Sequence, residues 1–244
     1  MKAMIFAAGL GTRLRPLTDS VPKALIDING KPALELVILK LKAAGVSEIV
    51  VNVHHFADKI TDFLQQNENF GLDIAISDES EQLLDTGGGI LAARRVLDGG
   101  GPFIVHNADI LTDFDVAAMY ERHLCSGADV TLLTQSRQSS RYLYFDSCGR
   151  MRGWGRADGS ARIPANLDTE NLAGLGFGGV SVVSPAVFPL LEAYASQNRV
   201  FSTTPFYASN CSALDIRSYT PAGNYRWVDI GKPETLAKAR ELWR

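Results

Sequence analysis

Short apolar runs alternate with segments of helical periodicity along the first 135 residues. Five runs predict buried strands, at residues 2–6, 48–53, 72–76, 103–106 and 130–134. Between them, apolar residues recur every three or four positions and predict helices at residues 34–44, 56–64, 90–97 and 116–123. Strands that are joined through helices are typical of parallel sheets. The pattern therefore predicts a Rossmann-like α/β fold, with a mostly parallel sheet and helices on both faces.

The regular alternation stops between Ser136 and Leu175. This stretch is rich in Ser, Gly, Arg and aromatic residues, and its strand candidates, residues 142–145 and 151–154, predict an inserted hairpin and loop. A core strand resumes at residues 178–183, and helices with proline in their first turn follow at residues 185–194 and 233–242. No repeat or low-complexity linker divides the chain. We therefore expect a single domain over residues 1–244, with one half at residues 1–135 and the other at residues 136–244.

Composition favours a soluble enzyme and excludes several other classes. The chain has 244 residues, of which 46% are hydrophobic, enough to bury a sizeable core. No apolar run reaches membrane-spanning length and Met1-Lys2 leads directly into a strand, so we expect a cytoplasmic protein without a membrane partner. A net charge of -3 gives no reason to expect nucleic acid. Cys125, Cys148 and Cys211 lack zinc-site spacing and are interpreted as reduced, buried or incidental thiols.

A glycine-rich basic loop, AAGLGTRLRP, follows the first predicted strand at residues 7–16. Gly9 and Gly11 remove side chains where the backbone must turn sharply and bring its N–H groups close to an anion. Arg13, Arg15 and Lys23 add positive charge around the same place. Fixed amide dipoles and cationic side chains together suit the phosphates of a nucleotide.

Two better-known phosphate loops do not fit these residues. The P-loop spacing is absent between Gly9 and Lys23. The dinucleotide fingerprint requires a third glycine where Leu14 stands, and no acidic residue closes a clear second strand about twenty residues later. A tight turn that serves only the fold would explain the two glycines taken alone. Their combination with the basic residues and prolines favours phosphate binding.

The complete motif resembles the signature of the sugar-1-phosphate nucleotidyltransferases. It reads GLGTRLRPLT at residues 9–18 and PKAL at residues 22–25. Further segments resemble the family's later signatures in the family's order, namely DTGGGI at residues 85–90, NAD at 107–109, GGV at 178–180 and WVDIG at 227–231. The resemblance covers nearly the whole chain, which makes coincidence a poor explanation.

The resemblance implies a role for each motif, with the nucleotide in the first half and the sugar in the second. The implied nucleotide-binding residues are Ala8, Gly9, Gly11, Thr12, Arg13, Lys23, Thr86, Gly87 and Gly88. The implied sugar-binding residues are Asn107 and Gly179, and the implied Mg²⁺ ligands are Asp109 and Asp229. Catalysis would rest on Arg13, Lys23 and Asp109.

The two aspartates also stand out by position. Asp109 follows an apolar strand and Asp229 follows the strand-like residues 225–228, and open α/β sheets bind ligands at such strand ends. Carboxylate oxygens there could hold Mg²⁺ against phosphate oxygens. Each aspartate could instead start the turn or helix that follows it. Lys232, beside Asp229, could reach a phosphate or remain solvated.

The four histidines do not form a catalytic signature. His54 and His55 end a strand, where adjacent side chains point to opposite faces. His106 could face the sugar or pack within the sheet, and His123 is interpreted as a solvated helix position. No Ser/His/Asp or Cys/His pattern is present, which weighs against hydrolase chemistry.

Substrate identity depends on a departure from the family pattern. Many members place a Glu-Lys-Pro element before the sugar-side strand, and this chain has none, so Arg152, Arg156 or Arg162 could supply the cation for the sugar phosphate. Together with the short chain and the DTGGGI segment, this absence looks most like the N-acetylmuramate-1-phosphate uridylyltransferases. It implies UTP and N-acetylmuramate 1-phosphate as substrates. Mannose-1-phosphate guanylyltransferase and glucose-1-phosphate thymidylyltransferase activities are the alternatives.

The three consecutive glycines at residues 87–89 bear on the nucleobase. Their backbone could approach a flat ring closely and pair with its edge, or the glycines could form only a flexible helix entrance. Two other functional classes stay open. A non-catalytic nucleotide-binding regulator could lose Asp109 and Asp229, which this chain keeps. A dinucleotide-dependent oxidoreductase would need the missing third glycine. The oligomeric state does not follow from the sequence.

Overall fold

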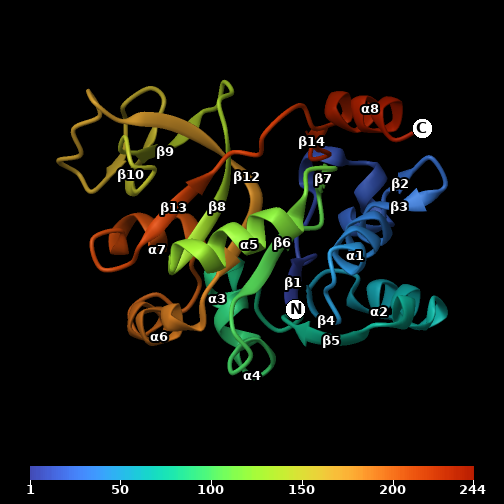
Figure 1. Ribbon diagram of the computed structural model, residues 1–244. Coiled ribbons are helices and arrows are strands. Elements are labelled where there is room, and N and C mark those ends of the chain that lie inside the picture. Colours follow the sequence, from blue (N-terminus) through green and yellow to red (C-terminus); the bar gives the residue numbers. More distant parts are fainter.

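A ten-stranded mixed sheet forms the centre of the computed structural model, which describes all residues 1–244 (Figure 1). The strand order is β11-β10-β9-β12-β6-β1-β4-β5, and β8 pairs with both β12 and β13. The strands are β1 (Lys2–Phe6), β4 (Glu48–Val53), β5 (Asp73–Asp78), β6 (Phe103–Asn107), β8 (Val130–Gln135), β9 (Arg141–Phe145), β10 (Met151–Arg156), β11 (Arg162–Ile163), β12 (Ala173–Val183) and β13 (Ile216–Tyr219).

The sheet changes character at the seam between β6 and β12. Strands β6, β1, β4 and β5 run parallel to one another, as the alternation of apolar runs and helices predicts. Strand β12 runs antiparallel to β6, β8 and β9, and β9 runs antiparallel to β10. Parallel strands need a crossover connection, which is usually a helix. Antiparallel strands such as β9 and β10 can be joined by a short turn.

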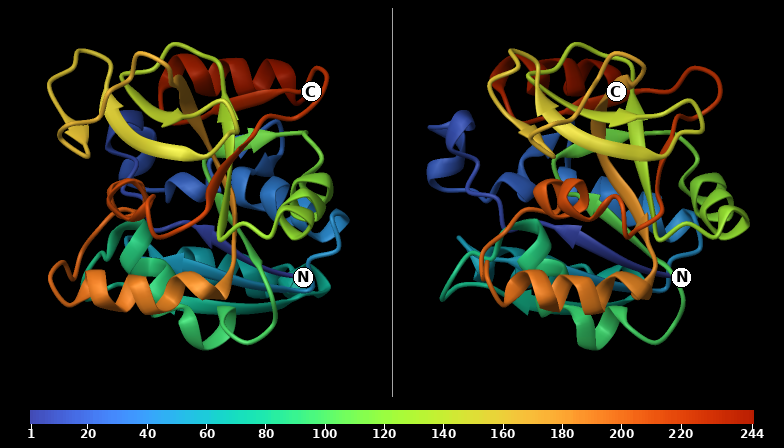
Figure 2. Two further views of the ribbon diagram at one scale, coloured as in Figure 1. Left: turned by 60° about the vertical axis from the view of Figure 1, so that its left-hand side comes forward. Right: turned by 90° about the vertical axis from the view of Figure 1, so that its left-hand side faces the viewer.

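Helices cover both faces of the sheet (Figure 2), and alternate residues of β1 belong to different hydrophobic cores. Ala3 and Ile5 belong to a core with residues of α1 (Ala33–Ala43), α2 (Ala57–Gln66), α5 (Val116–Ser126) and α8 (Pro233–Leu242). Met4 belongs to a second core with residues of α3 (Asp85–Ala92), α4 (Arg94–Leu97), α6 (Phe188–Ala195) and α7 (Thr203–Asn210). The predicted Rossmann-like α/β class is therefore confirmed, as a mixed sheet. None of these helices has the length and apolarity needed to span a bilayer.

Two small antiparallel pairs and several 3-10 turns lie outside the main sheet. Strands β7 (Ile110–Thr112) and β14 (Trp227–Asp229) pair with each other, as do β2 (Asp27–Ile28) and β3 (Lys31–Pro32). Three 3-10 helices shape the loop after β1, namely η1 (Thr12–Leu14), η2 (Leu17–Asp19) and η3 (Lys23–Leu25). The pair β7–β14 brings a segment near the end of the chain against the segment that follows β6.

Most predicted elements match the structure to within two residues, with three notable differences. The helix expected at residues 90–97 begins at Asp85 and divides into α3 and α4. The strand expected from Gly178 begins at Ala173. Helix α7 and strand β13 are absent from the predictions, and the segment that forms α7 has weak helical periodicity.

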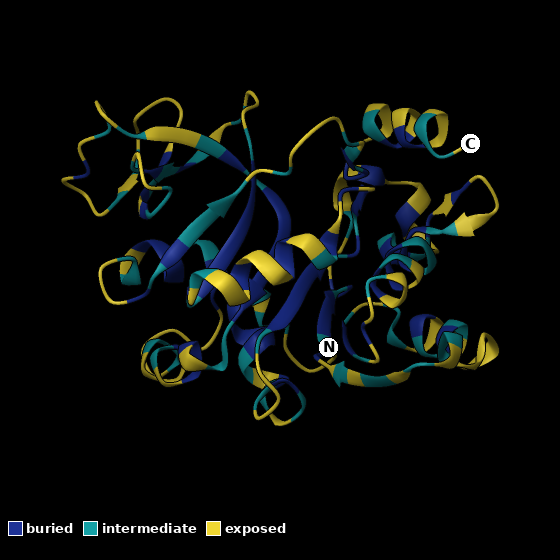
Figure 3. Cartoon of the chain, viewed as in Figure 1, coloured by how far each residue is buried: buried dark blue, intermediate teal, exposed yellow.

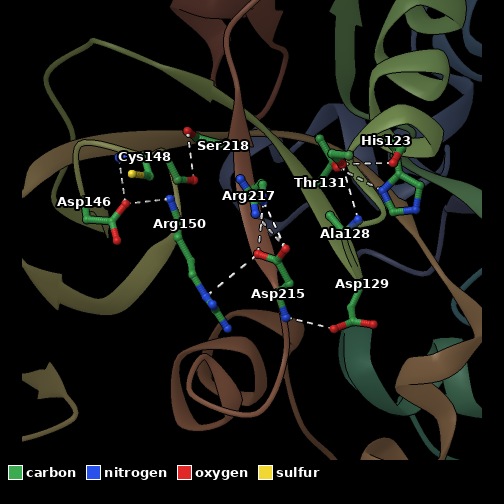
Figure 4. Close-up of polar contacts among 12 residues, drawn as sticks. His123, Ala128, Asp129, Thr131, Asp146, Cys148, Arg150, Asp215, Arg217 and Ser218 are labelled. Atoms are coloured by element: carbon green, nitrogen blue, oxygen red, sulfur yellow. Dashed lines mark hydrogen bonds and ion pairs between the residues drawn. The ribbon is translucent and has the colours of Figure 1, made fainter.

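The predicted inserted hairpin is present as β9 and β10 and lies at the same end of the molecule as α8 (Figures 1 and 2). Its loops are exposed, whereas its inward-facing residues Leu143, Phe145 and Met151 are buried (Figure 3). Charged contacts join it to β13. Arg150 lies 3.8 Å from Asp215, and the same carboxylate binds the side chain of Arg217 (Figure 4).

His123 is buried, so its assignment to a solvated helix position is wrong. Its side chain lies between α5 and the sheet, with Nδ1 2.9 Å from Thr131 Oγ1 (Figure 4). Its Nε2 lies 3.0 Å from Ser184 Oγ. Burial lowers its pKa to about 4, although the charge of Asp129 acts in the opposite direction. Both ring nitrogens of the neutral imidazole have a hydroxyl group as hydrogen-bond partner. A histidine can therefore be buried between α5 and the sheet.

Candidate active site

A cavity of about 550 Å³ opens at the carboxyl ends of β1 and β6. We call it the loop cavity, because the glycine-rich loop forms one of its walls. It is lined by Phe6, Ala7, Ala8, Gly9, Leu10, Gly11, Thr12, Arg13, Lys23, Ala24, Asn52, Leu83, Asp85, Thr86, Asn107, Ala108, Asp109, Val200 and Gly231. Nine of the residues that the family resemblance implies for ligand binding or catalysis lie together in this lining.

The two loop glycines have different physical roles. Gly11 has a φ of +62°, and a β-carbon there would lie 2.8 Å from Thr18 Cγ2. The hydroxyl of Thr18 donates to the Gly11 carbonyl at 2.9 Å, which fixes the turn. A β-carbon at Gly9 would meet no atom within 4 Å, so this position leaves open space on the cavity side. Gly11 therefore shapes the loop, and Gly9 provides room for a ligand.

Two buried polar side chains that hydrogen-bond to each other hold the backbone at the start of the glycine-rich loop. The Ala7 N–H donates to Asn52 Oδ1 at 2.8 Å, and Asn52 Nδ2 donates to Glu79 Oε1 at 2.8 Å. Both side chains are buried, and Asn52 also lines the cavity. Neither residue was expected from the sequence, although an asparagine within the apolar run at residues 48–53 was the available signal.

Arg13, Lys23 and Asp229 converge on the backbone of Gly231. A β-carbon at Gly231 would lie 2.7 Å from Arg13 Nη2, 2.7 Å from Asp229 Oδ1 and 3.1 Å from Lys23 Nζ. The Gly231 N–H donates to Asp229 Oδ1 at 2.7 Å. The absence of a side chain at Gly231 therefore allows two cations and a carboxylate from three segments to gather at one point.

Asp109 joins this group through Lys23 and through the β7–β14 pair. Its carboxylate forms an ion pair with the ammonium of Lys23, whose side chain is only 11% exposed. Its carbonyl accepts the Ile230 N–H at 3.0 Å, so the segments that carry Asp109 and Asp229 lie side by side. No group of three or more His, Cys, Asp or Glu side chains could hold a metal. Two carboxylates beside an open cavity fit Mg²⁺ that takes its remaining ligands from phosphates and water.

Asn107 and Gly179 meet where β6 passes β12. Asn107 lines the loop cavity. Gly179 is buried with a φ of +75°, and its β-carbon position lies 3.3 Å from Asn107 Nδ2. The register of β12 against β8 shifts between Phe177 and Ser181, around this glycine. Gly179 lines neither cavity described here and instead brings the backbone of β12 close to Asn107.

The triglycine segment packs against the chain instead of facing the cavity. Asp85 and Thr86 line the loop cavity, but Gly87 and Gly88 are buried in the first turn of α3. Their N–H groups donate to the Phe201 carbonyl at 2.8 and 3.3 Å. These N–H groups are thus used within the protein, and the two glycines allow close packing against residues 199–201. A nucleobase contact from this segment stays a prediction.

A second cavity, of about 610 Å³, lies between the end of β8, β14 and α8. We call it the basic cavity. Its lining comprises Gln135, Ser136, Arg137, Thr220, Tyr225, Trp227, Val228, Asp229, Lys232, Thr235 and Lys238. Asp229 lines this cavity and contacts Gly231 of the loop cavity, so the two cavities adjoin at Asp229.

The three arginines considered for the missing family lysine line neither cavity. Arg152 forms an ion pair with Asp146 at 2.7 Å, and Arg162 donates to the Leu167 carbonyl at 2.9 Å. Arg156 is exposed at the end of β10. The cations that do line the basic cavity are Arg137, Lys232 and Lys238. Only Lys232 was considered from the sequence, because the other two become neighbours only after folding.

The remaining histidines and the cysteines do not form a site. His106 was expected either to face the sugar or to pack within the sheet, and it is fully buried in β6. Burial lowers its pKa to about 4. His54 Nδ1 lies 2.7 Å from the Glu79 carbonyl and His55 is exposed. The three cysteines are free, and Cys125 and Cys148 are exposed.

Comparison with known proteins places this site in a family. Residues 2–145 match the model of the nucleotidyl transferase family. The chain is 34% identical over 246 aligned residues to N-acetylmuramate alpha-1-phosphate uridylyltransferase of Neisseria meningitidis, covering 99% of this chain and 98% of that protein. The chain belongs to the sugar-1-phosphate nucleotidyltransferases. It is also 36% identical to the protein of the same name from Caulobacter vibrioides, covering 97% of this chain and 94% of that one.

The fold of this nucleotidyltransferase is shared more widely than its sequence. A crystal structure from Bacillus anthracis, assigned as a glucose-1-phosphate thymidylyltransferase, superposes on this chain with a TM-score of 0.83. It covers 100% of this chain and 95% of that chain at 17% sequence identity. At this level of identity the likeness concerns the fold alone.

Proposed function

We propose that the protein transfers a uridylyl group from UTP to N-acetylmuramate 1-phosphate, forming a nucleotide sugar and pyrophosphate. The observation that carries this proposal is the near full-length similarity to two enzymes of that name, which extends through both cavities. Similarity confined to the nucleotide-binding half would support the family without supporting a particular acceptor.

The proposed reaction needs positioning and charge neutralisation. A phosphate oxygen of the sugar 1-phosphate attacks the α-phosphorus of UTP in line, and the bond to the leaving pyrophosphate breaks. The nucleophile is already an anion near neutral pH, so no general base is required. The main obstacle is repulsion between two anions, and fixed cations and amide dipoles lower it.

The cationic groups around Gly231 have separable roles in this proposal. Arg13 and the N–H groups of the glycine loop hold the β- and γ-phosphates, which leave as pyrophosphate. Lys23, which is largely buried beside Asp109, stabilises charge at the α-phosphate. Asp109 and Asp229 would hold Mg²⁺, which supplies further neutralisation of phosphate charge when bound. Asn107, which lines the loop cavity, would contact the sugar.

A pyrophosphate-release screen tests the substrates. The purified protein is assayed with ATP, CTP, GTP, UTP and dTTP, each crossed with a panel of sugar 1-phosphates that includes N-acetylmuramate, N-acetylglucosamine, mannose and glucose. An Asp109→Asn preparation controls for contaminating activity. The expected result is that UTP with N-acetylmuramate 1-phosphate gives the largest kcat/KM.

Other outcomes would assign a different substrate pair. If GTP with mannose 1-phosphate reacts more than about tenfold faster than any UTP pair, a difference of roughly 1.4 kcal/mol in transition-state binding, the uridylyl proposal is wrong. A preference for dTTP with glucose 1-phosphate would contradict it equally. Binding of a nucleotide without pyrophosphate release from any pair would favour a non-catalytic regulator.

A further inference from the structure

The basic cavity carries positive charges that form no ion pair within the protein. Arg137, Lys232 and Lys238 line it, against the single carboxylate of Asp229. None of the three cations takes part in an ion pair, although ten ion pairs occur elsewhere in the molecule. Cations that gather without acidic partners in a concave site favour an anionic ligand.

The positive charges in the basic cavity are spread over a longer distance than one phosphate group spans. Lys232 stands three residues after Asp229, at the junction of the two cavities, where the 1-phosphate of an acceptor would approach the nucleotide. Lys238 lies six residues farther along α8, which corresponds to roughly 9 Å at the rise of an α-helix. The cavity therefore offers positive charge both at the junction and well beyond it, which suits an acceptor with two separated anionic groups.

Arg137, which follows β8, is held in place by contacts with residues of β12 and β14. Its Nη2 donates to the Phe177 carbonyl at 3.1 Å, and its guanidinium carbon lies 4.9 Å from the centroid of the Trp227 ring. Trp227 is itself held, because its Nε1 donates to the Gly178 carbonyl at 2.9 Å. These contacts orient the guanidinium and leave most of its N–H donors unused. A planar donor fork of this kind matches a carboxylate with two parallel hydrogen bonds.

We infer that Arg137 and Lys238 form a specificity site for a carboxylate carried by the acceptor sugar, separate from its 1-phosphate. The inference rests on the proposed function and names the group that distinguishes its acceptor. N-acetylmuramate carries a carboxylate on its lactyl ether, whereas N-acetylglucosamine lacks this ether and is otherwise the same sugar. The loop cavity would then recognise the nucleotide, and the basic cavity would select an acidic sugar.

The test compares the two acceptors in matched variants. Arg137→Met and Lys238→Met remove the charge and keep a long unbranched side chain, so the packing of residue 137 over Trp227 is retained. Arg122→Met is the control, because Arg122 is an exposed arginine on α5 that lines neither cavity. Steady-state kinetics give KM and kcat for N-acetylmuramate 1-phosphate. N-acetylglucosamine 1-phosphate is measured as a competing ligand through its inhibition constant, so its turnover is not required.

The expected result is a selective loss of recognition. Arg137→Met raises the KM for N-acetylmuramate 1-phosphate about tenfold and Lys238→Met raises it by a smaller factor, with kcat changed less than about twofold. The inhibition constant of N-acetylglucosamine 1-phosphate stays within about twofold of the wild-type value, and Arg122→Met changes neither quantity.

Three outcomes would overturn the inference. Equal weakening of both sugars would show that Arg137 meets a group they share, such as the phosphate. Unchanged kinetics in both cavity variants would remove these residues from recognition. Tighter wild-type binding of the sugar without the carboxylate would show that the cavity does not select an acid. If the wild-type enzyme instead releases no pyrophosphate with UTP and N-acetylmuramate 1-phosphate, the proposed function itself fails, which the wild-type assay alone reveals.

Discussion

The two cavities that adjoin at Asp229 are lined by different chemical groups. The loop cavity takes eight of its nineteen lining residues from one contiguous segment, residues 6–13, four of which are Ala or Gly. The basic cavity is lined by charged and aromatic side chains from β14, α8 and the ends of β8 and β13. A backbone wall suits phosphates, which every nucleoside triphosphate shares, and a side-chain wall can change with the acceptor. Four predictions test this contrast, beginning with the point at which the cavities adjoin.

The largest effect is expected at the two aspartates. Asp109→Asn and Asp229→Asn keep the size of the side chain and remove the charge that would hold Mg²⁺. We expect each to lower kcat by at least about a hundredfold while the thermal unfolding curve stays close to wild type. Turnover is measured at saturating Mg²⁺. Near wild-type turnover in either variant would remove that residue from the metal site.

The next effect separates two cations of the loop cavity. Arg13→Ala should raise the KM for pyrophosphate in the reverse reaction about tenfold, whereas Lys23→Ala should mainly lower kcat. Arg13→Lys should restore only part of the loss, because an ammonium does not reproduce the guanidinium fork. Arg15→Ala is the matched control, since Arg15 is exposed, pairs with Asp19 and does not line the cavity. An unchanged pyrophosphate dependence in Arg13→Ala would contradict the assignment.

A smaller effect distinguishes the two loop glycines. Gly11→Ala places a methyl group at a positive φ and against Thr18, so we expect a loss of about 1–3 kcal/mol in unfolding free energy. Gly9→Ala meets no protein atom within 4 Å, and its unfolding free energy should stay within about 0.5 kcal/mol of wild type. Urea denaturation measures both. Equal destabilisation of the two variants would show that the backbone does not hold the two positions differently.

The sequence predicted the loop cavity better than the basic cavity for a physical reason. Gly9, Gly11 and Arg13 are neighbours along the chain, and a local pattern can reveal such a group. Arg137 and Lys238 lie far apart in the sequence and become neighbours only through the pairing of β12, β8 and β13 and the docking of α8. Nothing local distinguishes them from solvated surface cations.

The predicted helices and strands follow the same rule. Elements that depend on local periodicity were predicted correctly, and features that depend on contacts between distant segments were not. The parallel strands and the terminal helix follow from apolar periodicity, and β4 and α8 have the predicted bounds. The start of α3 does not, because glycine is a poor helix former and only the packing of Gly87 against Phe201 makes a helix there favourable. His123 was misplaced for a related reason, since its partners Thr131 and Ser184 come from other strands and loops.

The smallest expected effect concerns the two buried histidines, His106 and His123. The pKa of His123 and that of His106 are lowered to about 4 in the folded protein, against about 6.5 when unfolded. The unfolded chain therefore binds more protons as the pH falls below about 7, and stability is lost progressively down to about pH 4. Between pH 7 and pH 6 each histidine should remove roughly 0.7 kcal/mol of unfolding free energy.

Urea denaturation at pH 7 and pH 6 checks this expectation, with His123→Gln as the comparison. The variant should show about half of the wild-type change between the two pH values, even if its absolute stability is lower. An identical change in wild type and variant would mean that His123 is already protonated in the folded protein or does not titrate in this range.

The ion pair between Lys23 and Asp109 implies a link between ligands. In the structure the ammonium occupies the carboxylate that a divalent cation would need. A phosphate that attracted Lys23 would release Asp109, and a metal ion bound at Asp109 would release Lys23 to the phosphate. The affinities for nucleotide and metal would then rise together, and by thermodynamic reciprocity each would increase the other by the same factor. The ion pair would then compete with each ligand when it binds alone, and would be displaced when both bind together.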